Sequence, residues 1–395
     1  MEEFGMKKII ALLLVAVMAM CMFGCEALPS DVQAQVNQAI EENQDTINAV
    51  GEAVGEAVAE NSDLISSVQE KIGAVIEANS GTIEGVADQV EAGLQEALSG
   101  LGLAKQQRLN MVTGGESGTY YAFGGVIANV LGQKIPNLEI TAVTSGASAA
   151  NARSLNNGEA DLAILQNDVL DYAVNGTEIM KDDGAMPKLR AIATMYTETI
   201  QLVALKSSGI STVQDLKGKK VCVGAQGSGS EANAVQILSA YGLTYDDFDV
   251  QYLSFSEAST AMQQGTVDAA FATSGLPNTA IVELSKMKDI VVVPIDGAER
   301  DALIAQYPFY VKSTIPADTY GVNEAESVAI LATLACNEDL PEDVVFAITA
   351  GLFGYKSDIT AGHVRGADLD IAKAKDGVSV EFHPGALKFY ELMGM

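Results

Sequence analysis

At four places in this chain a short apolar run leads into a turn rich in glycine and serine, and a helix-forming segment follows. Glycine in such a turn allows positive φ values and lets a ligand approach the backbone closely. The first N–H groups of the following helix have no partner within it, and the helix dipole adds partial positive charge there. Carboxylates and phosphates bind at such helix starts. The pattern therefore predicts four strand–loop–helix units, each able to contribute donors to an anion.

The four units are spread over the last three quarters of the chain. Their turns begin at Gly114 (GGESGTYY), Thr144 (TSGASAAN), Gly224 (GAQGSGSEANAVQIL) and Thr273 (TSGLPNTAIVEL). In open α/β sheets ligands bind outside the carboxyl ends of the strands, so we expect the four turns to converge on one cleft. The alternative is four unrelated turns. Pro277 in the last unit is expected in the first turn of its helix.

Charge and cysteine content exclude several classes of function. The 395-residue chain has a formal net charge of −29, which argues against nucleic acid as a partner. Any anionic ligand must then be held by local donors. Cys222 and Cys336 lie in apolar runs and are expected to be buried thiols, although a disulfide between them stays open. No CxxC motif or Cys/His cluster occurs, so we expect neither a metal site nor a cofactor.

The N-terminus has the pattern of a secretory lipoprotein signal. Lys7-Lys8 precede the apolar run 9–20, which is too short to span a bilayer as a stable anchor. The sequence Met-Phe-Gly-Cys, ending at Cys25, resembles a bacterial lipobox. We expect residues 1–25 to be a signal peptide with lipid on Cys25, which would hold the protein at the outer face of the membrane. Ordinary signal cleavage near Cys25 is the alternative.

An acidic internal repeat follows. Between residues 28 and 99 apolar positions recur every 18 residues, as at Ile47, Ile65 and Ile83. Eighteen residues make about five turns at about 3.6 residues per turn, so the apolar stripe stays on one helix face. We expect residues 26–105 to form a helical spacer, with self-association through residues 28–99 as a further option. Several short helices or a flexible linker are the alternatives.

From Leu109 onward strands and helices alternate, which indicates an α/β fold. Seven ordered motifs here resemble the TAXI family, the TRAP-associated extracytoplasmic immunogenic solute-binding proteins. They are GGESGTYY (114–121), SGASAAN (145–151), LNNGEADLAILQNDV (155–169), SGISTVQDLKGKKVCVGAQGSGSEANAVQIL (208–238), VDAAFATSGLPNTAI (267–281), YPFYV (307–311) and HPGALKFYE (383–391). The resemblance implies a type II periplasmic-binding-protein fold with two lobes and a hinge. We expect lobe 1 at 106–200 and 330–395, and lobe 2 at 201–329.

The same resemblance implies a function. Such proteins capture a small organic anion, such as glutamate or a 2-oxoglutarate-like dicarboxylate, and deliver it to a TRAP-type membrane permease. Carried onto this sequence, the ligand-binding residues would be Ser117, Gly118, Thr119, Tyr120, Asn151, Gln166, Gly227, Ser228, Gly229, Ser230, Gly275 and Pro277. Ser230 stands where the family usually has threonine, which keeps the hydroxyl group.

Alternatives remain for individual residues and for the function. Tyr120 is expected to face outward and Tyr121 to pack, or the reverse. Asn151 could be a polar residue of a helix surface. Arg153 lies on a different helical face from Asn151, so we expect it in solvent and not as a carboxylate clamp. No GxSxG or HExxH motif occurs, so we expect no enzyme. A ligand-sensing surface lipoprotein that feeds no transporter is the alternative function.

Overall fold

The computed structural model describes residues 103–395. Two sets of predictions lie outside these residues: the signal peptide with Cys25, and the repeats at 28–99 with their self-association. Within residues 103–395 no helix is both long enough and apolar enough to cross a membrane.

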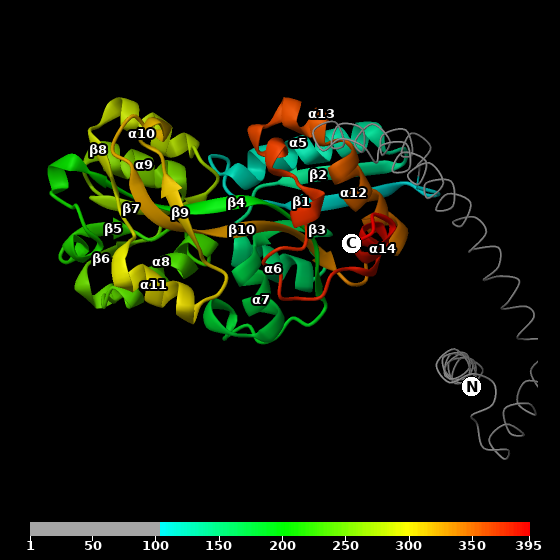
Figure 1. Cartoon of the computed structure of the whole chain (residues 1–395), viewed down its shortest axis with the longest axis horizontal. Coiled ribbons are helices and arrows are strands. Elements are labelled where there is room, and N and C mark those ends of the chain that lie inside the picture. The colour runs from blue at the N-terminus through cyan, green and yellow to red at the C-terminus, as the bar shows by residue number, and fades with distance from the viewer. Residues whose placement is uncertain (1–102) are drawn as a thin grey trace, which may run out of the picture. The chain divides into compact units, whose positions relative to one another are not determined.

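The first lobe begins with a parallel sheet and its helices. It also contains the last helices of the chain, and it lies to the right in Figure 1. Its elements are β1 (Gln107–Val112), α5 (Thr119–Lys134), β2 (Leu138–Val143), α6 (Ser148–Asn156), β3 (Leu162–Gln166), α7 (Asn167–Asn175), α12 (Glu342–Gly354), α13 (Lys356–Gly362) and α14 (Pro384–Leu392).

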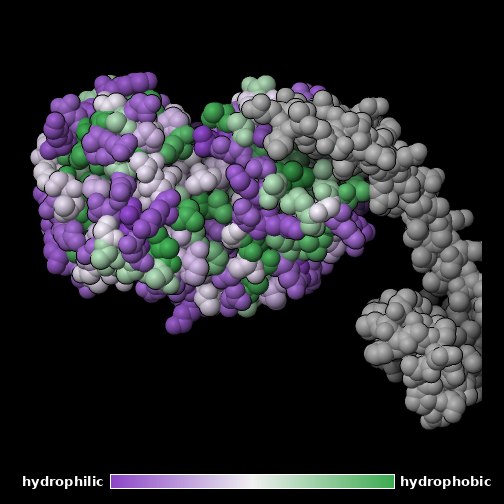
Figure 2. All heavy atoms as spheres, viewed as in Figure 1, coloured by the Kyte–Doolittle hydropathy of each residue, from purple (hydrophilic) through white to green (hydrophobic). Residues whose placement is uncertain are grey.

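The second lobe has a smaller sheet, and it lies to the left in Figure 1. Its elements are β5 (Lys220–Cys222), α8 (Gly229–Ala240), β6 (Asp249–Gln251), α9 (Phe255–Gln264), β7 (Ala269–Ser274), α10 (Thr279–Met287), β8 (Ile290–Val293), α11 (Gly297–Gln306) and β9 (Val311–Ile315). In this view hydrophilic residues cover much of the surface of both lobes (Figure 2).

Two long strands connect the lobes. β4 (Leu189–Leu205) and β10 (Ala325–Asn337) are antiparallel neighbours in a sheet of order β2-β1-β3-β10-β4-β7-β5-β6. β4 pairs with β10 up to Thr199, and from Thr199 onward it pairs with β7 and β8 of the second lobe. This is the two-lobed mixed α/β fold expected of a type II periplasmic binding protein, and the predicted fold class is confirmed. The predicted lobe boundaries, at 200/201 and 329/330, fall inside these two strands.

The single strand β4 contains two apolar runs, 190–195 and 201–205, with a polar stretch between them. Thr197, Glu198 and Thr199 interrupt the apolar pattern, but all three pair within the sheet. Their polar side chains belong to the segment that passes between the lobes. The interruption therefore marks a change of surroundings along one strand and not the end of a strand.

Each lobe has its own apolar core. In the first lobe α6 and α7 pack on β3 around Leu155, Leu165 and Val169. In the second lobe α8 packs on β7 around Ile237, Phe271 and neighbours from β4 and β10. Cys222 and Cys336 are both buried free thiols, as expected, and they do not form the disulfide that was the alternative.

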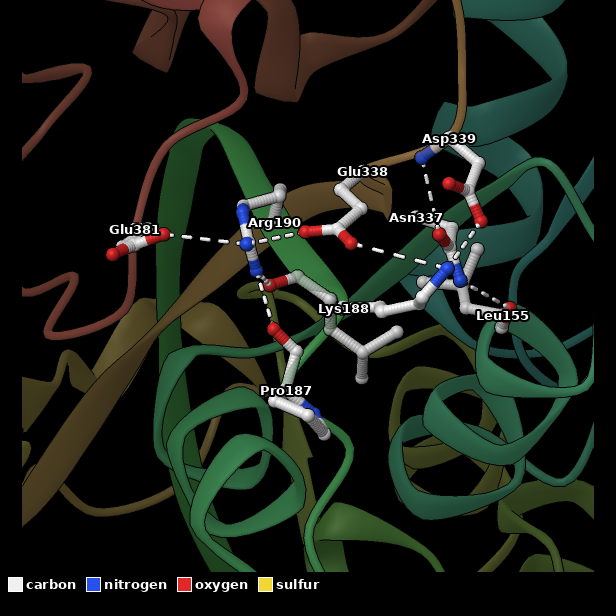
Figure 3. Close-up of polar contacts among 9 residues, drawn as sticks. Leu155, Pro187, Lys188, Arg190, Asn337, Glu338, Asp339 and Glu381 are labelled. Carbon is white, nitrogen blue, oxygen red and sulfur yellow. Dashed lines mark hydrogen bonds and ion pairs between the residues drawn. The ribbon is translucent and has the colours of Figure 1, made fainter. Parts of the chain in front are cut away.

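The C-terminal segment docks onto the first lobe through the main chain and through charges. The Ala191 N–H donates to Glu381 O at 3.0 Å, and the His383 N–H donates to Ala191 O at 2.9 Å. Arg190 forms ion pairs with Glu338 at 2.5 Å and Glu381 at 3.3 Å (Figure 3). His383 caps α14, as its position before Pro384 suggested.

Candidate functional site

A cavity of about 90 Å³ lies where the two lobes meet, a volume that holds several water molecules or a small ligand. All four Gly/Ser turns contribute to it, which confirms that they converge on one cleft. Its lining consists of Gly114, Gly115, Ser117, Gly118, Thr119, Tyr120, Ser145, Gly146, Ala147, Ser148, Gln166, Glu198, Ala225, Ser228, Gly229, Ser230, Ser254, Phe255, Thr273 and Ser274.

Four helices begin at the cavity wall, with their first residue in its lining: α5, α6, α8 and α9. In the described part of the chain no side chain caps the first turn of α5 or α6, whereas Ser228 caps α8 by accepting from the Glu231 N–H at 3.2 Å. The uncapped N–H groups and the helix dipoles favour negative charge in the cavity. The donors predicted from the turns are therefore present from both lobes.

The loop before α6 is held in a strained conformation. Ala147 lines the cavity with φ 67° and ψ −152°, a region that is nearly restricted to glycine. The Ala147 N–H donates to Ser145 Oγ at 3.1 Å, and the Ser145 hydroxyl donates to Asn151 Oδ1 at 2.6 Å. Strain of this kind concentrates at ligand sites, where surrounding contacts maintain it.

Gln166 and Gly229 bring the lobes into direct contact at the cavity. A β-carbon added to Gly229 would overlap the amide end of the Gln166 side chain, so a larger residue here would displace that amide. Gln166 is 2 % exposed, and its Oε1 is buried without a hydrogen-bond partner while the residue lines the cavity. An unpaired buried acceptor costs about 1–3 kcal/mol, so a donor on a bound ligand would be favoured here.

Glu198 is the only acidic side chain in the cavity lining formed by residues 103–395, and that lining contains no lysine or arginine. It lies on β4, and its Oε2 accepts from the Tyr120 hydroxyl at 2.6 Å. Burial raises the pKa of this carboxyl to about 8, although the hydrogen bond from Tyr120 acts in the opposite direction. At neutral pH the cavity therefore presents mainly a neutral acid beside the helix starts.

The structure places eight of the twelve predicted ligand-binding residues in the cavity lining. These are Ser117, Gly118, Thr119, Tyr120, Gln166, Ser228, Gly229 and Ser230. Binding by these eight residues stays a prediction.

Asn151, Gly227, Gly275 and Pro277 lie outside the lining. Asn151 is fully buried, and its amide donates to Thr113 O at 2.6 Å and to Ile164 O at 2.7 Å. Its two amide hydrogen bonds join the residue that follows β1 to the middle of β3, so Asn151 holds these strands together behind the site. Pro277 is not in the first turn of α10, since Asn278 is the N-cap and accepts from the Ile281 N–H.

The two glycines outside the lining lie where the lobes approach each other. A β-carbon at Gly275 would lie 3.3 Å from Thr119 Oγ1, and one at Gly227 would lie 3.5 Å from Arg153 Nη1. Arg153 itself is partly exposed, pairs with Asp183 at 2.7 Å and does not line the cavity. It is therefore not a carboxylate clamp in this structure, in agreement with the prediction.

The expectation for the two neighbouring tyrosines was wrong in part. Tyr121 is the exposed residue, whereas Tyr120 is buried and its hydroxyl points to Glu198. Tyr120 occupies the first turn of α5, so its side chain lies against the cavity floor.

Glu198, Ser254 and Phe255 are the cavity residues that the sequence motifs missed. A glutamate within the apolar run 189–205 was a usable signal, because a charged residue in a buried strand usually has a function or a partner. Phe255 follows Ser254 in a capping box that begins α9, and nothing in its local pattern indicated a ligand site. Within residues 103–395 no cluster of three His, Cys, Asp or Glu side chains is arranged to hold a metal ion.

Solved structures with low sequence identity resemble the chain. The alkanesulfonate-binding protein SsuA from Xanthomonas axonopodis pv. citri is 17% identical over 73% of this chain and 85% of its own, with a TM-score of 0.44. A putative L-cystine ABC transporter from Listeria monocytogenes is 15% identical over 67% of this chain and 98% of its own, with a TM-score of 0.43. The GluR0 ligand-binding core in complex with L-glutamate is 13% identical over 67% of this chain and 99% of its own, with a TM-score of 0.40.

A family model gives the more extensive match. It spans residues 111–394, which include all four Gly/Ser turns, both strands that connect the lobes and the C-terminal helix. The chain therefore belongs to the NMT1-like family.

Proposed function

We propose that this protein is the extracytoplasmic solute-binding component of a TRAP-type transporter. It captures a small organic anion, glutamate or a similar dicarboxylate, between its two lobes and delivers it to a membrane permease. It performs no chemistry on its ligand, and lipid on Cys25 holds it at the outer face of the membrane.

The observation that carries this proposal is the composition of the cavity. Uncapped starts of α5 and α6 and the start of α8 supply donors for a carboxylate, and no cationic side chain competes for that role within the described lining. Each hydrogen bond to a charged group contributes about 1.5–3 kcal/mol, so several of them support micromolar binding after the cost of association.

Two features of the cavity favour a ligand that also donates hydrogen bonds. Gln166 Oε1 has no partner, and Glu198 offers carboxyl oxygens on the cavity side of β4. A ligand with an amino group beside its carboxylate would satisfy both acceptors. A ligand with only carboxylates would require Glu198 to remain protonated, which its burial favours.

The transporter assignment rests on the sequence motifs that resemble TAXI proteins and on membership of the NMT1-like family.

The test is calorimetric titration of the full chain, purified without refolding, with L-glutamate and 2-oxoglutarate. This pair shares a carbon skeleton and differs in an amino against a keto group. Gln166→Ala should weaken binding about tenfold, which corresponds to ~1.4 kcal/mol, and Arg153→Ala should have little effect. Loss of binding in Arg153→Ala with full binding in Gln166→Ala would replace the neutral-donor cavity by an arginine clamp.

Transport is tested separately. Deleting the gene should abolish uptake of whichever acid binds. Binding without any effect of deletion on uptake would favour the sensing lipoprotein instead.

A further inference from the structure

Outside the ligand cavity, one helix of each lobe meets its counterpart through polar side chains. Asp168 and Tyr172 lie four residues apart on α7, and Asn233 and Gln236 lie three apart on α8. Such spacings place each pair on one helix face. Two hydrogen bonds cross between the lobes: Asn233 Nδ2 donates to Asp168 Oδ2 at 3.0 Å, and Gln236 Nε2 donates to the Tyr172 hydroxyl at 3.0 Å.

A tyrosine of the second lobe joins the two crossing bonds into one network. The Tyr310 hydroxyl accepts from Asn233 Nδ2 at 2.9 Å and donates to Gln236 Oε1 at 2.5 Å. Exposure is at most 4 % for all five residues of this network, Asp168, Tyr172, Asn233, Gln236 and Tyr310. The ring of Tyr172 also packs edge-on against Phe309, with ring centroids 5.9 Å apart.

The network is connected to the cavity without being part of it. None of its five described members lines the cavity. Thr273, which does, donates through Oγ1 to Asn233 Oδ1 at 2.9 Å. The side-chain amide of Asn233 thus has one partner in the first lobe, Asp168, and two in the second, Tyr310 and Thr273.

The two crossing hydrogen bonds and the contact between the Tyr172 and Phe309 rings exist only while the lobes touch. Separation of α7 from α8 would break both crossing bonds and expose apolar ring surface of Tyr172 and Phe309 to water. Water would replace part of the hydrogen bonding, but not the packed geometry that five buried residues maintain together. The network consequently favours the closed arrangement of the lobes whether or not a ligand is present.

We propose that the α7–α8 network is a latch that holds the two lobes together from outside the ligand cavity and so strengthens ligand binding. A ligand that binds only between closed lobes gains apparent affinity in proportion to the fraction of closed protein. The latch thus adjusts affinity through residues that never contact the ligand. The effect on affinity rests on the proposed function, whereas the effect on lobe contact does not.

The main experiment is hydrogen exchange of the ligand-free full chain, followed by mass spectrometry. Tyr172→Phe removes one crossing hydrogen bond and keeps the ring. Because Tyr172 is in the first lobe, faster exchange in α8 of the second lobe reports loss of contact between the lobes. We expect roughly fivefold faster exchange there, and a similar increase in α7 when Gln236→Ala is introduced in the opposite lobe.

Tyr241→Phe is the matched control. It makes the same chemical change at the end of α8, but the Tyr241 hydroxyl bonds Asp296 within the second lobe. The latch is overturned if Tyr172→Phe leaves exchange in α8 unchanged, or if Tyr241→Phe increases exchange in α7 as much as Gln236→Ala does.

Titration with L-glutamate and 2-oxoglutarate supplies the second measurement. For whichever acid binds the wild-type protein, Tyr172→Phe should weaken binding about fivefold. The double variant Tyr172→Phe, Gln236→Ala should be no weaker than Gln236→Ala alone, because both changes remove the same bond. Additive losses would contradict the latch. If neither acid binds, the proposed ligand class is wrong, and the exchange experiment still decides on the latch.

Discussion

Replacing Glu198 by glutamine should remove a large part of the pH dependence of folding stability. Glu198 is 2 % exposed, and burial raises its pKa to about 8. In the unfolded chain the pKa returns to its ordinary value near 4.5. The folded protein therefore binds the proton more tightly than the unfolded chain does.

The sign and size of the pH dependence of folding stability follow from the difference between the folded and unfolded pKa of Glu198. An acid whose pKa is raised by folding contributes most stability at low pH, and this contribution falls as pH rises from about 4.5 to about 8. Between pH ~5 and pH ~9 the loss is roughly 4 kcal/mol at about 1.4 kcal/mol per pKa unit. Glutamine keeps the shape and an acceptor for Tyr120 but has no proton to lose.

The assay is chemical denaturation of the ligand-free protein near pH 5 and near pH 9. At the higher pH, Glu198→Gln should be more stable than wild type by several kcal/mol, and near pH 5 the two should be similar. Asp168, whose pKa burial raises to about 7, contributes with the same sign and remains in both proteins. The exposed Glu283→Gln is the control for loss of one carboxyl charge. An identical pH dependence in wild type and Glu198→Gln would refute the buried-acid reasoning.

Further substitutions probe the cavity, its supports and the anchor. Gly229→Ala places a β-carbon against Gln166 and should weaken binding of the captured acid at least tenfold by calorimetry, whereas Gly125→Ala, with open space around it, should not. Ala147→Gly should raise the free energy of unfolding by about 1 kcal/mol or more by relieving strain, and an unchanged denaturation midpoint would contradict that. Asn151→Ala should lower the free energy of unfolding by about 2–3 kcal/mol, because it leaves two buried carbonyl groups without their donors; a loss of binding at full stability would instead place Asn151 in the ligand site. Cys25→Ser should release the protein from the membrane fraction in cell fractionation, and a variant that stays bound would locate the anchor elsewhere.

The sequence predicted the parts of the site that depend on local chain geometry. Gly/Ser turns after apolar runs specify a strand, a tight loop and a helix start, and that information lies within about ten residues. The cavity floor was harder to predict, because Glu198 and Tyr120 are 78 residues apart and only the folded sheet brings them together. The role of Asn151 was missed for the same reason, since its partners Thr113 and Ile164 belong to other segments.

The α7–α8 latch could not be predicted from the local sequence either. Asp168 and its partner Asn233 are 65 residues apart in the sequence. Polar residues at helical spacing usually indicate a solvated face. Here the i, i+4 pair on α7 and the i, i+3 pair on α8 face each other and are buried, which only the arrangement of the lobes determines.

Binding of an anion by so acidic a chain is physically consistent. At physiological ionic strength, charges beyond about 8 Å in solvent are largely screened, so most of the 52 acidic residues have little influence in the cavity. A carboxylate within the cavity is not screened, and Glu198 is the one that the described lining contains. Burial neutralises it at neutral pH by raising its pKa, which leaves the helix starts as the dominant local field. The local field at the site, and not the net charge, therefore decides which ligand the protein accepts.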